Sequence, residues 1–264
     1  KSLTSDQQYI VDEILTQINE GTYKVFIVEG DPGSGKTILA NYLLKELTEQ
    51  GKDAALVFSM TSIRKTVQEV FKSVLGMNEK VIGPADLRKK KYEVLIVDEA
   101  HRLNRRKNLA NYGIFDKVNQ HFGLDNDGDQ LDWISKSADI TILFYDSLQS
   151  IKPSDIEPEK LQKYIEDSNA LVLKLEDQIR IQGGNEYLEI INNILYQLNS
   201  PNPSLDNYEF KIFDEINEMK DLINKRNNSH GFSRLIAGYD WDWQSKDGSK
   251  DYDIEINNLQ LKWN

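Results

Sequence analysis

The chain has 264 residues and a formal net charge of −11; 39% of its residues are hydrophobic and 28% are charged. This composition is typical of a soluble protein of one large or two modest domains, and its acidity argues against a surface coated in nucleic-acid contacts. The sequence shows neither a run of ~20 apolar residues nor a charged-then-apolar leader before Leu3, so we expect no membrane partner. The absence of cysteine excludes disulfides and thiolate metal sites, and fits a cytoplasmic location.

The first predicted element is an amphipathic helix. Thr4 and Gln7 have the spacing of a capping box, apolar residues follow at helical intervals, and Gly21 ends the pattern. Residues 23–29 then predict a buried strand, and residues 38–47 predict a second amphipathic helix.

The eight residues between that strand and that helix fit the pattern Gly-x4-Gly-Lys-Thr at every fixed position. They are Gly30, Asp31, Pro32, Gly33, Ser34, Gly35, Lys36 and Thr37. A strand, a glycine-rich loop and a helix N-terminus form an anion site, because backbone N–H groups wrap phosphates and the helix dipole adds positive potential. We expect Lys36 to reach the β- and γ-phosphates of a nucleoside triphosphate and Thr37 to ligate Mg²⁺. The alternative is a chance match in a surface loop.

A further strand and helix follow this loop. Residues 54–59 predict a second core strand, and residues 62–75 predict a helix. Five apolar residues share one face of this helix and are expected to be buried: Ile63, Val67, Val70, Phe71 and Val74.

The apolar run 92–97 predicts a parallel strand covered on both faces, and acidic residues stand at its end. Carboxylates at the carboxyl end of such a strand face the crevice that also holds the phosphate loop. We expect Asp98 to hold Mg²⁺ through water, and Glu99 to orient or deprotonate the attacking water. The alternative is that both residues only cap the strand or start the next helix.

Basic residues flank this acidic strand. Positions 88–107 hold eight basic residues against three acidic ones. Such a strip could track a phosphate backbone, with Arg102 and Arg105 as candidate contacts, or it could be two solvated loops.

The following segment completes an alternation of strands and helices. Residues 125–129 superficially suggest a calcium loop, which we reject because Lys136 stands where a twelfth-position Glu is required. Trp133 is expected on a short helix packed against the sheet, and residues 140–145 predict the fourth strand. The alternation indicates an α/β fold with a parallel, doubly wound sheet.

The composition shifts after Ile151, where prolines mark a loop and a domain boundary is expected near 150–180. A smaller α/β unit is predicted beyond it. Beyond the loop, strands are expected at 170–175, 208–213 and 233–239, and helices at 186–198 and 215–225. The stretch from Trp241 to Trp243 gives no prediction.

With these motifs in order, the chain resembles a superfamily 1 helicase motor. More narrowly, it is similar to the bacterial family of Schlafen group 3-like DNA/RNA helicase domains. The resemblance covers almost the whole chain and rests chiefly on residues 30–37 and 98–101. It implies a RecA-like P-loop NTPase domain over residues 1–175 and a partial, truncated second α/β motor domain over residues 176–264.

The resemblance also implies roles for residues outside those two motifs. It places Gln7 at the adenine, although a glutamine at a helix start is commonly just a cap. Thr61 and Ser62 match contacts to single-strand phosphates. Gln149 matches the γ-phosphate sensor of a Gly-Asp-x-x-Gln element, although Tyr145 replaces the glycine of that element here. Arg180 matches an arginine finger; the alternative is that it is a surface arginine.

The implied function is Mg²⁺-dependent ATP hydrolysis coupled to binding of, or movement along, single-stranded DNA or RNA. Motors of this kind also have a Gln-Gly element and a second arginine, and nothing after Arg180 supplies either, so we expect a fragment of a longer protein or a reduced ATPase. The alternative is a nucleotide-switched signalling or defence module that binds a protein partner and does not translocate. A small-molecule kinase fits residues 98–101 less well. The sequence predicts no oligomeric state.

Overall fold

The computed structural model describes residues 3–75, 80–109, 111–146, 149, 152–175, 184–198, 203–205, 208–238 and 240–263. The chain divides into two compact units, Lys1–Asn207 and Tyr208–Asn264. This division falls at a later position than the predicted boundary between residues 175 and 176. The assignment of residues 176–264 to a second motor domain stays a prediction.

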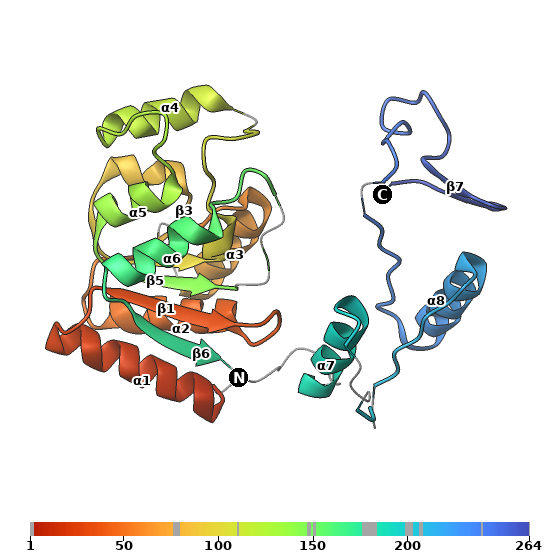
Figure 1. Cartoon of the computed structure of the whole chain (residues 1–264), viewed down its shortest axis with the longest axis horizontal. Helices are drawn as coiled ribbons and strands as arrows, with labels where there is room; N and C mark the ends of the chain where they lie inside the picture. Colours follow the sequence, from red (N-terminus) through yellow and green to blue (C-terminus); the bar gives the residue numbers. More distant parts are fainter. Residues whose placement is uncertain are drawn as a thin grey trace. The chain divides into compact units, whose positions relative to one another are not determined.

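The first unit is built on a six-stranded sheet in which every pair of neighbours is parallel, in the order β3-β2-β4-β5-β1-β6 (Figure 1). The strands are β1 (Val25–Gly30), β2 (Ala54–Phe58), β3 (Val81–Ile82), β4 (Tyr92–Asp98), β5 (Ala138–Tyr145) and β6 (Leu171–Leu175). The predicted parallel α/β fold is confirmed. Because β5 lies between β1 and β4, the carboxyl ends of these three strands stand side by side, and the segments that follow them meet there.

Helices cover both faces of this sheet. They are α1 (Ser5–Glu20), α2 (Lys36–Glu49), α3 (Thr61–Leu75), α4 (Tyr112–His121), α5 (Gln130–Ser137) and α6 (Pro158–Asp167), with 3₁₀ segments at Pro84–Lys89 and Ala100–Arg102. One core cluster joins α1, α2 and α3 to one face, and a second joins α4, α5 and α6 to the other (Figure 1). Trp133 of α5 is buried in the second cluster, as predicted.

The strands read as continuous apolar runs because successive side chains enter opposite core clusters. In β1, Phe26 and Val28 belong to the first cluster, whereas Val25 and Ile27 belong to the second. Both faces are therefore dry, which is the reason that a parallel sheet shows no polar alternation.

The predicted buried stripe of α3 is only partly correct. Phe71 is buried and Val67 is partly buried, but Ile63 and Val70 are exposed, with 53% of Val70 accessible. At ~100° per residue, Ile63 and Val70 lie about 80–100° round the helix from Phe71, so a helix that rests on the margin of the sheet at β2 and β3 leaves them in solvent. The side chains of Ser62 and Val74 lie outside the described residues.

The sequence did not predict β3, α4 and α6. Strand β3 has only two residues, which is too short for a pattern. Helix α6 begins with Pro158 at its first position, where proline suits a helix, but the neighbouring prolines indicated a loop. The helix expected at 186–198 is present as α7 (Gly184–Leu195).

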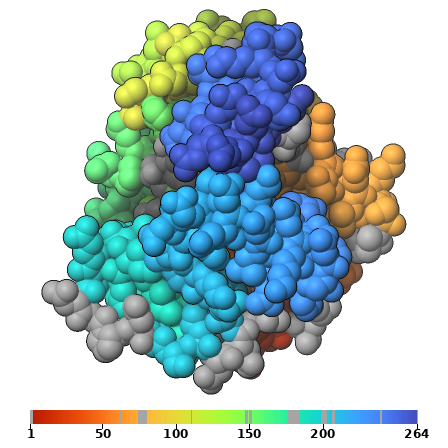
Figure 2. Space-filling model, turned by 90° about the vertical axis from the view of Figure 1, so that its right-hand side faces the viewer, coloured from red at the N-terminus to blue at the C-terminus, as the bar shows by residue number. Residues whose placement is uncertain are grey.

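The second unit consists of α8 (Ile216–His230) and a hairpin of β7 (Ile254–Ile256) and β8 (Leu259–Leu261). The helix was predicted, but the predicted strands at 208–213 and 233–239 are wrong over their described residues, which contain no strand. Ile212 and Ile236 are 74% and 90% exposed, so the described residues do not cover the apolar positions of these two alternating patterns. Figure 2 draws the C-terminal residues in the darkest blue, and within them Trp263 Nε1 donates a hydrogen bond to the Trp241 carbonyl (3.3 Å).

No helix among the described residues is both long and apolar enough to span a bilayer.

Candidate nucleotide site and adjoining cavity

Residues 30–37 join β1 to the N-terminus of α2, as the pattern predicted. Gly33 and Gly35 have φ of 92° and 93°, a left-handed conformation that favours glycine, and Gly35 is the residue that caps α2. A Cβ on Gly30 would approach Ser34 Oγ to 2.6 Å and Leu175 Cβ to 3.0 Å. The fixed glycines are therefore required by the shape of the loop.

Lys36 is buried at the base of this loop, with 7% of its side chain exposed. Its Nζ donates hydrogen bonds to the carbonyl oxygens of Gly30 and Asp31, the latter at 3.0 Å. It also lies 3.6 Å from Oδ2 of Asp146, a carboxylate only 2% exposed that follows β5. The ammonium group is thus surrounded by oxygen atoms, one of them formally charged.

Thr37 and Asp98 meet although 61 positions separate them. The Thr37 hydroxyl donates a hydrogen bond of 2.8 Å to Asp98 Oδ2. Burial raises the pKa of Asp98 to about 6, against the effect of this hydrogen bond. A hydroxyl and a carboxylate side by side fit Mg²⁺, which binds through one or two carboxylates, water and phosphate oxygens. The described residues contain no group of three or more His, Cys, Asp or Glu side chains that could hold a metal ion by themselves.

Glu99 follows β4 in the left-handed region, with φ of 55°. Its Oε2 lies 2.8 Å from His101 Nε2, and this contact holds the pKa of Glu99 below its ordinary value. His101 Nδ1 accepts a hydrogen bond of 3.3 Å from the backbone N–H of Asp146, so we assign the ring proton to Nε2. Glu99 is therefore held as a carboxylate beside the phosphate loop.

Gln7 joins α1 to the phosphate loop. It completes the predicted capping box with Thr4, and its Nε2 donates a hydrogen bond of 3.2 Å to the Ser34 carbonyl. The alternative role as a cap is thus present in the structure, and the adenine contact stays a prediction. Gln149 lies beyond β5, where its N–H donates to the Asp146 carbonyl (3.4 Å). Arg180 lies outside the described residues.

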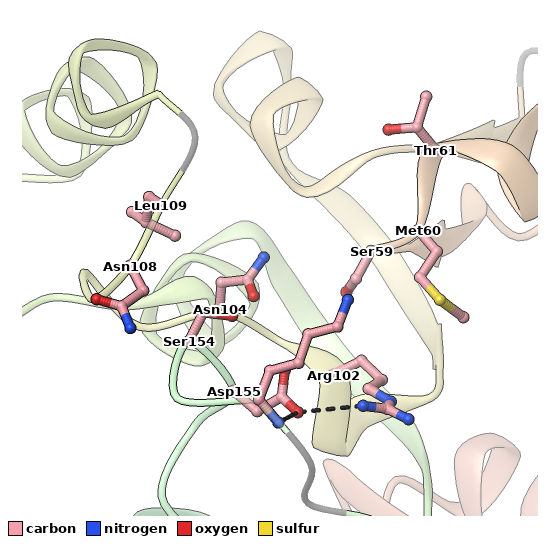
Figure 3. Close-up of a pocket in the computed structure, with 10 residues that line it drawn as sticks. Ser59, Met60, Thr61, Arg102, Asn104, Asn108, Leu109, Ser154 and Asp155 are labelled. Atoms are coloured by element: carbon pink, nitrogen blue, oxygen red, sulfur yellow. Dashed lines mark hydrogen bonds and ion pairs between the residues drawn. The ribbon is translucent and has the colours of Figure 1, made fainter. Parts of the chain in front are cut away.

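A second feature adjoins this site at the carboxyl ends of β2 and β4. It is a cavity of about 460 Å³ lined by Ser59, Met60, Thr61, Arg102, Asn104, Asn108, Leu109, Lys152, Ser154 and Asp155 (Figure 3). The predicted contacts Thr61 and Arg102 both line it. Arg102 Nη1 pairs with the buried Asp155 at 3.3 Å, while Arg102 Nε and Ser59 Oγ are buried without a hydrogen-bond partner among the described residues. Buried polar atoms are ordinarily hydrogen-bonded, so both are exceptions within the residues that line this cavity.

Sequence reasoning missed most of the residues that line this cavity. Lys152, Ser154 and Asp155 lie in a loop that the sequence marked only as a turn. The pairing of Asn104 with Asp155 brings this loop to the cavity. Sequence reasoning placed Asp146 in the element similar to Gly-Asp-x-x-Gln, but it gave a role in that element only to Gln149.

Most of the basic strip is paired with carboxylates. The pairs that link it to segments outside the strip include Lys90 to Asp53, Lys91 to Asp139, Arg102 to Asp155, Arg105 to Glu157 and Arg106 to Asp116. Arg105 does not line the cavity. Its guanidinium instead binds Glu157 and the Pro153 carbonyl, so the structure does not bring Arg105 together with Thr61 and Arg102.

Comparison with known families gives a match over residues 23–264 to the model described as Schlafen group 3, DNA/RNA helicase domain. The chain belongs to this family. A Schlafen group 3 member carries a helicase-type, P-loop nucleotide-binding domain, and the phosphate loop described above lies within the matched residues.

Two curated relatives show the extent of the similarity. The uncharacterized protein YPL245W of Saccharomyces cerevisiae is 23% identical over 99% of this chain and 66% of its own length. The signal recognition particle receptor FtsY of Metamycoplasma hominis is 32% identical over 39% of this chain and 33% of its own. This Schlafen group 3 domain therefore spans only part of the length of either relative.

Solved structures are similar at a lower level. Bacteroides Pif1 bound to ssDNA is 17% identical, with a TM-score of 0.39 over 92% of this chain and 59% of that one. Domain III of the Thermotoga maritima replication initiation protein DnaA is 13% identical, with a TM-score of 0.37 over 88% of this chain and 89% of that one.

Proposed function

We propose that this chain is a Mg²⁺-dependent ATPase whose hydrolysis is coupled to the binding of single-stranded nucleic acid. The observation that carries the proposal is the hydrogen bond between Thr37 and Asp98, because it joins the phosphate loop to the acidic end of β4 beside Glu99. Phosphoryl transfer demands little beyond positioning and charge neutralisation, which these groups supply.

Each group has a role that its position supports. Lys36 would neutralise the β- and γ-phosphates, and Thr37 with Asp98 would hold Mg²⁺. When bound, the ion offsets the charge on the phosphate oxygens. Glu99, held as a carboxylate by His101, would orient the attacking water and accept its proton.

Three further assignments come from the family resemblance. Gln7 would contact the adenine, Gln149 would sense the γ-phosphate, and Arg180 would act as the arginine finger. Gln7 already touches the phosphate loop through Ser34. An exchange of its hydrogen bonds would therefore link base binding to the loop.

We propose that the nucleic acid backbone binds in the cavity beside the nucleotide site. Arg102 Nε and Ser59 Oγ are buried donors without partners among the described residues, and phosphate oxygens are acceptors of the matching kind. Arg102 follows Glu99 by three positions, so a strand bound there would contact the segment that holds the catalytic carboxylate.

Hydrolysis by the variant Glu99→Gln tests the chemistry. The amide keeps the shape and loses the proton acceptor, so we expect turnover to fall by at least about 10²-fold while ATP affinity stays near that of the unaltered chain. The exposed Glu49→Gln, on the surface of α2, is the matched control and should leave turnover unchanged. Equal turnover in the chain and in Glu99→Gln would refute the role of Glu99.

A nucleotide-switched module that binds a protein partner is the second candidate function. The observation that favours it is the neutralisation of Arg105 and Arg106 by carboxylates, which makes these two side chains less available to a phosphate backbone. The dependence of nucleic acid binding on salt concentration distinguishes the two candidate functions. Nucleic acid binding weakens steeply as salt rises, because bound phosphates release counterions, whereas hydrolysis indifferent to DNA and RNA would favour the module.

A further inference from the structure

The ion pair between Lys36 and Asp146 belongs to none of the roles above. Lys36 Nζ lies 3.6 Å from Asp146 Oδ2, and both side chains are more than nine-tenths buried. At this separation and burial a carboxylate competes effectively for an ammonium group, because little water screens the pair. A triphosphate that uses Lys36 must therefore share it with Asp146 or displace it.

Asp146 is also tied to the catalytic carboxylate. Its backbone N–H donates to His101 Nδ1 (3.3 Å), and His101 Nε2 lies 2.8 Å from Glu99 Oε2. One residue thus contacts the phosphate-binding lysine through its side chain, and the histidine that orients Glu99 through its main chain. A shift of Asp146 away from Lys36 would move the hydrogen bond that fixes His101.

We propose that Asp146 is a positioning residue that competes with the γ-phosphate for Lys36 and transmits the outcome to Glu99 through His101. A phosphate that takes Lys36 weakens the hold on the Asp146 carboxylate and repels it, since both groups are negative. Asp146 then moves, and His101 and Glu99 move with it. This inference rests on the proposed function, because ATP is the ligand that would compete.

The variant Asp146→Asn removes the competing charge with almost no change of shape. We expect it to bind the β,γ-methylene analogue of ATP at least about fivefold more tightly than the unaltered chain, the lower end of the coupling between linked sites. Its kcat with ATP should fall, because Glu99 no longer receives the signal. Isothermal titration calorimetry and steady-state hydrolysis of the full chain, both with Mg²⁺, measure the two quantities.

Asp139→Asn is the matched control, since Asp139 is exposed at the other end of β5 and pairs with Lys91. It should leave affinity and kcat unchanged. If Asp146→Asn does not fold, Asp146→Ser removes the same charge and must show the same tighter binding. A second variant, His101→Asn, should lower kcat but keep the affinity for the analogue, because His101 does not contact Lys36.

The outcomes separate this inference from the proposed function. Tighter binding together with lower kcat supports the inference, because a merely structural role would weaken binding. Equal or weaker binding by the Asp146 variants, while the unaltered chain binds the analogue, overturns the inference alone. An unaltered chain that binds no analogue overturns the proposed ATPase and the inference with it.

Discussion

The carboxylate of Asp98 is buried at the end of β4. Its contact with Thr37 lowers the pKa, but burial dominates and raises it to about 6, from an ordinary value of 3.8. The folded chain therefore binds this proton more tightly than the unfolded chain. Stability from this group is full below about pH 4 and is lost as pH rises through about 6. The residue was predictable from the sequence; its burial was not.

The variant Asp98→Asn removes that charge. In the absence of metal and nucleotide, we expect it to be more stable than the unaltered chain by about 2–3 kcal/mol at pH 8, and equally stable near pH 4, where the folded carboxyl is already protonated. Thermal unfolding in EDTA at the two pH values measures the difference. Asp139→Asn should show none, and a gain of the same size at both pH values would contradict this account.

Whether a strand or helix could be predicted from the sequence depended on how much of its surface is buried in the fold. Strands β1, β2, β4 and β5 have both faces buried, so their apolar runs identified them. The two-residue β3 and the three-residue β7 and β8 are fixed by pairing with neighbours, which no local pattern reveals. The alternation at 208–213 resembled a strand, but Ile212 faces solvent.

Helix α3 gives a matched pair of substitutions. Phe71 is buried in the first core cluster, so Phe71→Ala should cost about 3–5 kcal/mol of unfolding free energy. Val70→Ala, one position earlier and exposed, should change it by less than about 0.5 kcal/mol. Urea unfolding of the two variants checks the orientation of α3. Similar losses from both would show that the face predicted from periodicity is buried after all.

For the candidate site, as for the strands and helices, the sequence predicted only the features that local patterns determine. The phosphate loop and the acidic pair were identified from local motifs, because loop geometry and strand ends dictate their residue types. The contacts of Asp146 with Lys36, and of Arg102 with Asp155, join segments far apart in sequence and depend on strand order. No spacing rule supplies such contacts.

Over the whole molecule, charge limits where nucleic acid can bind. The net charge is −11, and Lys90, Arg105 and Arg106 are offset by neighbouring carboxylates. Long-range attraction of a polyanion is therefore weak. The proposed contact therefore relies on the local chemistry of the cavity, where Arg102 Nε is buried without a hydrogen-bond partner among the described residues.

The central claim is that ATP hydrolysis responds to a single strand bound in that cavity. The direct measurement is ATP turnover by the purified chain with and without single-stranded DNA and RNA, at low and at moderate salt. We predict several-fold stimulation by at least one polymer, its loss as salt rises, and its loss in Arg102→Ala but not in Arg105→Ala. Turnover that neither polymer changes at either salt concentration would contradict the claim and favour the protein-binding switch.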